Sequence, residues 1–230
     1  MDQSRTAIIT GEEGVQKLHN ATVAIFGVGG VGGYALEAIA RSGVGTIHIF
    51  DYDTVTPSNI NRQIIAMESS MGRTKCSVAR ERMLDINPRL SLFTHETRLT
   101  PENMEELVAG RFPFAIDAID DVPAKIALLE TLLHDGSRFI SSMGAGNRLD
   151  PARIRVTDIG KTSNCPLARS IRKKLRERGI TEGIRCIYSD ETPVKHDTRS
   201  TDTTVGSISY LPGLFGLTAA GVIINDILKG

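Results

Sequence analysis

The sequence predicts an α/β fold: a Rossmann-like, doubly wound, mainly parallel sheet with additional C-terminal strands and helices. Three observations predict it. The apolar run 21–26 leads directly into the glycine-rich segment 27–32, which is typical of a strand, a tight turn and a helix N-terminus. A second apolar run ends at Asp51, 19 positions after the last of these glycines. Strand-like and helix-like patterns then alternate as far as residue 145, as in strands joined by crossover helices.

The elements of the first part follow in a regular order. Residues 11–20 fit a short amphipathic helix and residues 21–26 the first strand, and the helix after the glycines is expected to end at Gly43. The other expected strands are 46–50, 90–94, 112–119 and 138–142. The other expected helices are 57–63, 73–86, 101–109 and 122–134. Strand 112–119 is apolar nearly throughout, as expected of a parallel strand covered on both faces.

The pattern changes after Gly146. The expected elements there are strands at 154–159 and 184–188, a basic helix at 167–178, a polar loop at 189–207 and a helix at 211–228. Polar residues within 211–228 favour a buried helix over a membrane anchor. We therefore expect a single domain over residues 1–230, with a nucleotide-binding core at 1–146 and a substrate-facing extension at 147–230.

Composition narrows the class of protein. A chain of 230 residues that is 40% hydrophobic can bury a sizeable core. The formal net charge is zero, so any basic surface must be local. The three cysteines are far apart, which indicates a reducing compartment and excludes a zinc ribbon built from Cys-x-x-Cys pairs. The N-terminal residues carry no signal-peptide core, so we expect a cytoplasmic protein.

The glycine turn predicts a nucleotide site. Gly27, Gly29, Gly30 and Gly32 let backbone amides approach phosphates, and Asp51 is placed to accept a ribose hydroxyl. A dehydrogenase would show the same features. The residues just beyond Asp51 favour a triphosphate instead, because an arginine holds phosphate oxygens bidentately and amides orient them. These residues are Asp53, Ser58, Asn59, Asn61, Arg62 and Gln63. The alternative for this cluster is a polar surface loop.

Two further charged positions fit the same site. Lys75 lies near the start of the expected helix 73–86, where a lysine is disfavoured unless an anion is close, so it is a candidate phosphate ligand. Asp120 and Asp121 follow strand 112–119, at the edge of the sheet where ligands bind. Asp120 is a candidate anchor for Mg²⁺. The alternatives are a solvated lysine and an aspartate that caps the next helix, and the two aspartates could divide the roles.

Together these motifs resemble the ubiquitin-activating E1-like (ThiF/MoeB/HesA) superfamily, whose members use ATP to adenylate a carboxylate. Within it the chain is similar to the tRNA threonylcarbamoyladenosine dehydratases (TcdA/CsdL-like) over nearly its whole length. The matching segments are GVGGVGGYALEAIARS at 27–42, ISSMGAG at 140–146, LDPARIR at 149–155 and the basic helix from Pro166.

The resemblance implies ATP- and Mg²⁺-dependent dehydration of N6-threonylcarbamoyladenosine in tRNA. The threonyl carboxylate attacks the α-phosphate, an acyl adenylate forms, and ring closure within the same side chain expels AMP. The resemblance assigns catalytic roles to Arg62, Lys75 and Asp120. It also implies a homodimer in which an N-terminal arginine reaches the partner's triphosphate, and Arg5 is the only arginine before the first strand.

The basic helix is the candidate tRNA contact, since gripping a nucleic-acid backbone needs several positive charges on one surface. Its candidate residues are Arg169, Arg172, Lys173, Lys174 and Arg176. The alternative is a solvated helix face.

The alternative function is an adenylyltransferase that activates the C-terminal glycine of a ubiquitin-like sulfur-carrier protein. Many members of that branch carry structural zinc on Cys-x-x-Cys pairs, which this sequence lacks. Cys186 lies in an expected strand, where a cysteine is more often a core residue than a nucleophile. The sequence leaves open whether a cysteine desulfurase or another sulfur-acceptor partner cooperates.

Overall fold

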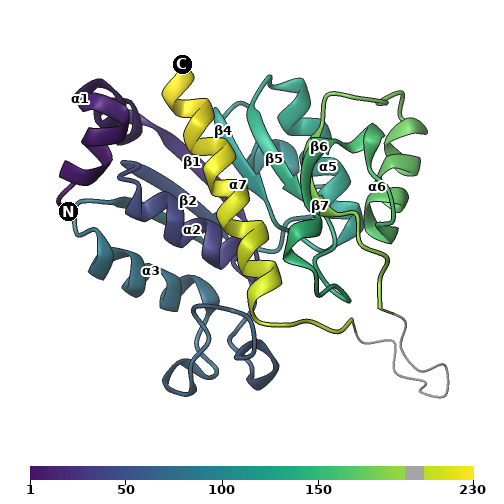
Figure 1. The fold of residues 1–230 in the computed structure, drawn as a ribbon, viewed down its shortest axis with the longest axis horizontal. Coiled ribbons are helices and arrows are strands. Elements are labelled where there is room, and N and C mark those ends of the chain that lie inside the picture. The colour runs from purple at the N-terminus through teal and green to yellow at the C-terminus, as the bar shows by residue number, and fades with distance from the viewer. Residues whose placement is uncertain (195–204) are drawn as a thin grey trace.

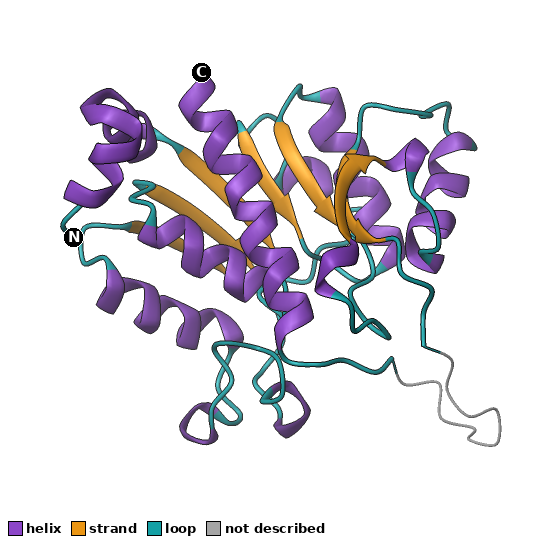
Figure 2. Cartoon of the chain, viewed as in Figure 1, coloured by secondary structure: helices purple, strands orange, loops and turns teal. Residues whose placement is uncertain are grey.

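The protein has a seven-stranded sheet of order β3-β2-β1-β4-β5-β7-β6 with helices on both faces (Figures 1 and 2). The computed structural model describes residues 1–194 and 205–230. The strands are β1 Thr22–Phe26, β2 Thr46–Phe50, β3 Ser91–His95, β4 Phe114–Asp117, β5 Arg138–Ser142, β6 Ile154–Asp158 and β7 Arg185–Ser189. All described pairings are parallel except that of β6 with β7, so the expected doubly wound, mainly parallel fold is confirmed.

Two helical layers cover the sheet and give it two apolar cores. One face carries α1 Ser4–Asn20, α2 Gly32–Arg41, α3 Lys75–Ile86 and α7 Tyr210–Lys229. The other carries α4 Met104–Leu107, α5 Val122–His134 and α6 Pro166–Arg176. Because crossover helices bury both faces of a parallel sheet, the central strands β1 and β4 are apolar nearly throughout.

Three expected helices differ most from the bounds in the structure. The helix expected at 11–20 begins at Ser4, because two helical stretches meet at a kink where Gly11 has φ 70°. The helix expected at 101–109 covers only Met104–Leu107, and the one expected at 57–63 is a 3₁₀ turn at Pro57–Asn59. Of the polar loop expected at 189–207, Ser189 closes β7 and residues 195–204 lie outside the described part of the chain.

The C-terminal helix α7 is long and apolar enough to meet the length and composition test for a membrane span. Half of the tested window is buried inside the fold. Buried residues such as Phe215, Ala219 and Ile223 belong to the core shared with α2 and β1. The contacts are those of a core helix, as the polar residues within it predicted.

A stacked histidine pair joins β2 to the edge strand β3. His48 Nδ1 lies 3.1 Å from His95 Nε2, and the His95 ring stacks on Phe50 with centroids 4.1 Å apart. Burial lowers the pKa of His48, and the neighbouring His95 lowers it further. Burial also lowers the pKa of His95, and Arg111 adds to the shift. Both rings therefore favour the neutral form in the fold.

We predict that the pair makes stability depend on pH. The unfolded chain binds more protons than the fold between the lowered pKa values and the usual value of about 6.5, so the free energy of unfolding rises with pH there. Urea titrations between about pH 5 and pH 7 measure the slope. The His48→Leu/His95→Leu protein should show a flatter slope, whereas a change at exposed His19 (His19→Asn) should leave it unaltered. An equal slope in the double variant would refute the assignment.

Candidate nucleotide-binding site

The candidate site lies at the carboxyl edge of the sheet, where the strand order reverses. β1 is flanked by β2 and β4, and the crossovers leave it in opposite directions. The carboxyl ends of β1, β2 and β4 therefore open on one crevice, which is where open parallel sheets bind ligands. The glycine turn follows β1, Asp51 follows β2, and the 118–121 loop follows β4.

The glycine turn is shaped by close backbone approaches. Gly27 has φ 87°, and a Cβ there would lie 2.9 Å from the Ala118 carbonyl oxygen. A Cβ at Gly32 would lie 1.8 Å from the Gly27 carbonyl oxygen, closer than any side chain allows. The turn thus needs glycine at both positions, and it opens the N-terminus of α2 toward the crevice.

Asp51, Asp53 and Lys75 form one charged cluster at the end of β2. Asp51 accepts hydrogen bonds from the Val28 amide at 2.7 Å and the Asp53 amide at 2.9 Å. The Lys75 ammonium lies 2.7 Å from Asp53 and 3.8 Å from Asp51, and its side chain is 7% exposed. Burial raises the pKa of the Asp51 carboxyl, and Lys75 opposes that rise. The sequence predicted an anion beside Lys75 at the start of this helix. In the fold, the carboxylates of Asp51 and Asp53 lie there.

The polar cluster after Asp51 folds back over the glycine turn. A Cβ at Gly30 would lie 3.4 Å from Arg62 Cγ, and one at Gly29 would lie 3.8 Å from Gln63 Nε2. Gln63 is 6% exposed, and among the described residues its side-chain oxygen has no hydrogen-bond partner. A buried polar atom without a partner is costly, so this amide is suited to a ligand or a water beside the turn.

Other members of this cluster hold the loop itself. The Asn59 side-chain oxygen accepts from the Thr56 amide at 3.2 Å and closes a capping box. Arg62 Nη1 donates to the Ser58 carbonyl at 2.8 Å and to Asn61 Oδ1 at 2.9 Å. The Asn59 side-chain oxygen therefore holds the loop, whereas Arg62 is held beside the turn with its guanidinium partly accessible.

The two aspartates after β4 divide their roles. Asp121 caps α5 by accepting from the Ala124 amide at 3.0 Å, and it also pairs with Arg98 at 3.3 Å. Asp120 is exposed, and within the described residues its carboxylate forms no hydrogen bond or ion pair. The sequence left open which aspartate caps the next helix. Asp121 is that cap, and the Asp120 carboxylate is free among the described residues.

The sequence interpretation missed a buried group below this loop. Asp117, Lys125 and Ser141 are each 0% exposed. Lys125 Nζ lies 2.8 Å from Asp117 Oδ2 and donates to the Ile119 carbonyl at 2.8 Å, and the Ser141 hydroxyl donates to Asp117 at 2.5 Å. The signal for this group was a carboxylate inside an apolar strand and a lysine inside an apolar helix. Because buried charges need partners, these two could have been expected to pair.

The start of α7 also borders the site, although it is remote in sequence. A Cβ at Gly30 would lie 3.1 Å from Pro212 Cβ, and one at Gly216 would lie 2.2 Å from the Val31 carbonyl oxygen. Just before α7, the Ser207 carbonyl accepts from Asn61 Nδ2 at 3.1 Å. The nucleotide crevice thus combines residues from both ends of the chain.

Arg5 lies away from this crevice in its own chain. The preceding Gln3 donates to the Arg41 carbonyl at 3.3 Å, at the end of α2 opposite the glycine turn. A helix of the length of α2 rises about 15 Å between its ends. Arg5 is exposed, as are Ile8 at 84% and Ile9 at 87% on the same helix.

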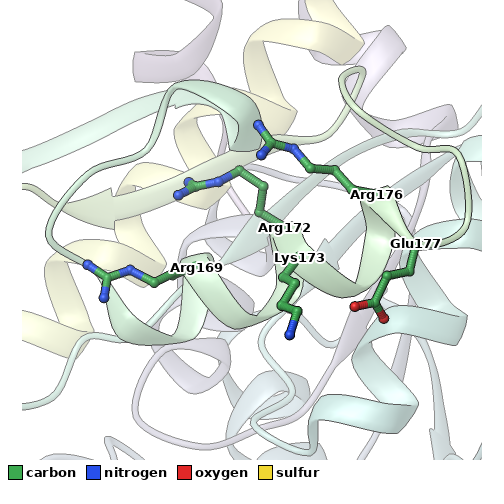
Figure 3. Close-up of a pocket in the computed structure, with 5 residues that line it drawn as sticks. All are labelled: Arg169, Arg172, Lys173, Arg176 and Glu177. Atoms are coloured by element: carbon green, nitrogen blue, oxygen red, sulfur yellow. The ribbon is translucent and has the colours of Figure 1, made fainter.

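The basic helix α6 presents most, but not all, of its expected cations freely. Arg169, Lys173, Lys174 and Arg176 are exposed. Arg172 is half-buried and donates to the Thr162 and Ile159 carbonyls, so it anchors the preceding turn. A hollow of about 390 Å³ is lined by Arg169, Arg172, Lys173, Arg176 and Glu177 (Figure 3).

All three cysteines are free and buried. Burial raises the pKa of the Cys76 thiol to about 12, and the charge of Asp51 adds to the rise. Burial likewise raises the pKa of Cys186 to about 12. Because the thiolate is the reactive form, neither residue is suited to nucleophilic chemistry. Cys186 is a core residue, as its place in β7 predicted.

Known proteins with the same architecture include enzymes that act on tRNA. The chain is 38% identical to a tRNA threonylcarbamoyladenosine dehydratase of Bacillus subtilis, over 98% of this chain and 94% of that protein. The crystal structure of the E. coli enzyme TcdA in complex with ATP superposes with a TM-score of 0.92 at 32% identity, covering 98% and 93% of the two chains. Its complex with AMP gives a TM-score of 0.91.

Similarity to an adenylyltransferase/sulfurtransferase covers a shorter part of the chain. A probable adenylyltransferase/sulfurtransferase, MoeZ, of Mycobacterium tuberculosis is 34% identical over 56% of this chain and 33% of its own length. The ThiF family model matches residues 2–229. The chain therefore belongs to the ThiF family.

Proposed function

We propose that the protein is an AMP-forming enzyme that dehydrates N6-threonylcarbamoyladenosine in tRNA. ATP activates the threonyl carboxylate as an acyl adenylate, pyrophosphate leaves, and an internal group closes the ring and expels AMP. The observation that carries the proposal is the near full-length similarity to dehydratases, including one solved with ATP and with AMP. The charged crevice at the carboxyl edge of the sheet supplies what adenylation needs.

Adenylation brings one anion against another, so the site has to neutralise charge. The glycine-turn amides and the N-terminus of α2 supply fixed dipoles for the phosphates. Arg62, held over Gly30, supplies a fixed cation beside them. Lys75 keeps the acidic cluster of Asp51 and Asp53 from repelling the nucleotide. The ring closes without a protein nucleophile because the attacking group is tethered to the activated carbonyl.

The free carboxylate of Asp120 fits Mg²⁺. In nucleotide sites this ion is commonly held by one or two carboxylates together with substrate phosphates and water. Asp120 offers such a carboxylate at the crevice, and the described residues hold no cluster of three acidic, histidine or cysteine ligands that would suit another metal. When bound there, Mg²⁺ would offset the charge of the leaving pyrophosphate.

A homodimer would complete the site with Arg5 of the second copy. Arg5 cannot reach its own crevice, because its helix packs at the far end of α2. The exposed Ile8 and Ile9 beside it give α1 an apolar surface that a second copy would cover.

The substrate tRNA would lie on α6. Figure 3 shows the three arginines Arg169, Arg172 and Arg176 extending from the helix around the hollow. Arg169 and Arg176 are exposed and can each meet a backbone phosphate, Lys173 and Lys174 add charge, and Arg172 keeps the helix seated on the turn before it.

We predict that Arg169→Glu/Arg176→Glu weakens tRNA binding. The slope of log affinity against log salt concentration should become shallower by about the amount that two phosphate contacts contribute. Filter binding over a salt series measures both quantities. ATP affinity should stay at the wild-type value, since α6 lies outside the crevice. The matched control is Arg80→Glu on α3 at the other side of the fold. Equal losses in both variants would mean that α6 is not a specific tRNA surface.

The function itself is tested by incubating the protein with ATP, Mg²⁺ and modified tRNA. We expect AMP release and a nucleoside that has lost the mass of one water. Pyrophosphate exchange that requires a sulfur-carrier protein instead would favour the alternative activity. We place the reaction in the cytoplasm, where tRNA is modified. Burial raises the pKa of the Cys76 and Cys186 thiols, so the proposal gives neither of them a role in sulfur transfer.

A further inference from the structure

The buried Lys125 is a charged group that the proposed chemistry does not use. It comes from α5, carries no exposed surface, and forms an ion pair with Asp117 at the end of β4. Its Nζ also donates to the Ile119 carbonyl at 2.8 Å. The lysine therefore reaches from the helix to the loop that carries Asp120.

Both backbone groups of Ile119 are bound by this ion pair. Its carbonyl accepts from Lys125, and its amide donates to Asp117 Oδ1 at 3.1 Å. The Ile119 carbonyl belongs to the peptide unit that begins Asp120, so Lys125 sets the orientation of that unit. The residues on either side of this peptide unit are also held. The Ala118 amide donates to the Phe26 carbonyl at 2.8 Å, and Asp121 caps α5.

Stability alone does not account for a charged pair at this depth. Removing two charges from water costs several kcal/mol per ion, and apolar side chains of similar volume are often as stable or more so. The surrounding core is apolar on both sides of β4. What an apolar pair would lose is the donor to the Ile119 carbonyl, and with it the fixed placement of Asp120.

We propose that Lys125 is a positioning residue that acts through Asp120. By holding the Ile119–Asp120 peptide unit, it fixes the place of the Asp120 carboxylate, which has no partner among the described residues, at the carboxyl edge of the sheet. The proposal rests on the proposed function for the role of Asp120. It adds a residue that never touches the nucleotide.

The test compares wild type, Asp120→Asn, Asp117→Asn/Lys125→Met, and the triple variant that combines them. The double variant removes both charges at nearly constant volume and leaves a side-chain amide oxygen at position 117 for the Ile119 amide. Glu37→Gln/Arg82→Met is the matched control, since it removes an ion pair of mostly buried Glu37 between α2 and α3. Three quantities are measured: free energy of unfolding, hydrogen exchange of residues 118–121, and kcat for AMP formation with its Mg²⁺ dependence.

We expect the double variant to keep the wild-type free energy of unfolding or exceed it, to exchange faster at 118–121, and to lose about 10- to 100-fold in kcat. The triple variant should lose no more than Asp120→Asn, because residues that act through one another are not additive. The control should keep wild-type kcat and wild-type exchange in this loop.

Wild-type exchange at 118–121, a wild-type kcat, or a triple variant that is slower than Asp120→Asn would overturn the proposal. A double variant that does not fold would also overturn it, since the pair would then be needed for stability. If wild type itself forms no AMP from modified tRNA, the proposed function fails. The exchange result still decides whether Lys125 holds the loop.

Discussion

Mixing inactive Arg5→Ala protein with inactive Arg62→Ala protein should restore about a quarter of the wild-type activity, because half of the dimers are mixed and each has one intact site. The intact site would combine Arg62 of one copy with Arg5 of the other. Alone, each variant should lose about 10³-fold in AMP formation, the scale of an arginine that neutralises charge in phosphoryl transfer. The measurement is AMP release after the two proteins are mixed, exchanged at low concentration and concentrated again.

Two results would contradict this arrangement. Arg5→Ala protein with wild-type turnover would remove Arg5 from the site. Mixtures that stay inactive, although mass spectrometry detects mixed dimers, would mean that Arg5 does not act across the interface. A change at exposed Glu12 on the same helix (Glu12→Gln) is the control for general damage to α1. Breaking the dimer with Ile8→Glu/Ile9→Glu should lower activity as much as Arg5→Ala, since both remove the second copy's arginine.

Asp120→Asn should lower kcat for AMP formation by about 10²- to 10³-fold, as the loss of one group that stabilises charge in the transition state does. The side chain keeps its size and its exposure, so the fold should be unaffected. ATP binding in EDTA should match wild type, whereas the gain in ATP affinity on adding Mg²⁺ should shrink. Isothermal titration with and without the metal measures that gain.

The neighbouring aspartate is the matched control for this prediction. Asp121→Ala removes the cap of α5 and should cost about 1 kcal/mol of folding free energy. Its effect on kcat should be small, because its carboxylate is bound to the Ala124 amide and Arg98 rather than free. If the two substitutions slow the reaction equally, Asp120 has no special role and the loop is sensitive only as a whole.

The sequence predicted the fold well because hydrophobic period and turn residues act locally. Strands 46–50 and 138–142 and helix 122–134 have the predicted bounds, since each is closed by a clear local signal. The start of α1 at Ser4 and its kink at Gly11 were not predicted, and after the kink Lys17 contacts α7 by donating to the Leu228 carbonyl. Tertiary contacts of this kind override local propensity.

The sequence predicted many of the residues of the candidate site, but it did not predict how their side chains contact one another. The glycine turn, Arg62 and Gln63 do meet, because a parallel sheet brings the ends of its strands to one edge. The pairing of Lys75 with Asp53 and Asp51, and the anchoring role of Arg172, depend on side-chain geometry that spacing does not encode. Asp117 and Lys125 were visible in the sequence as charges within apolar segments, yet only the structure pairs them.

The place of α7 has a consequence for biosynthesis. A ribosome makes the glycine turn well before Pro212 and Gly216, which pack on it. Until then the apolar face of α2, including Leu36 and Ile39, lacks its cover. A nascent chain that already holds Asp51, Arg62, Lys75 and Asp120 therefore cannot finish the crevice. Apolar surface of this kind favours aggregation until α7 covers it.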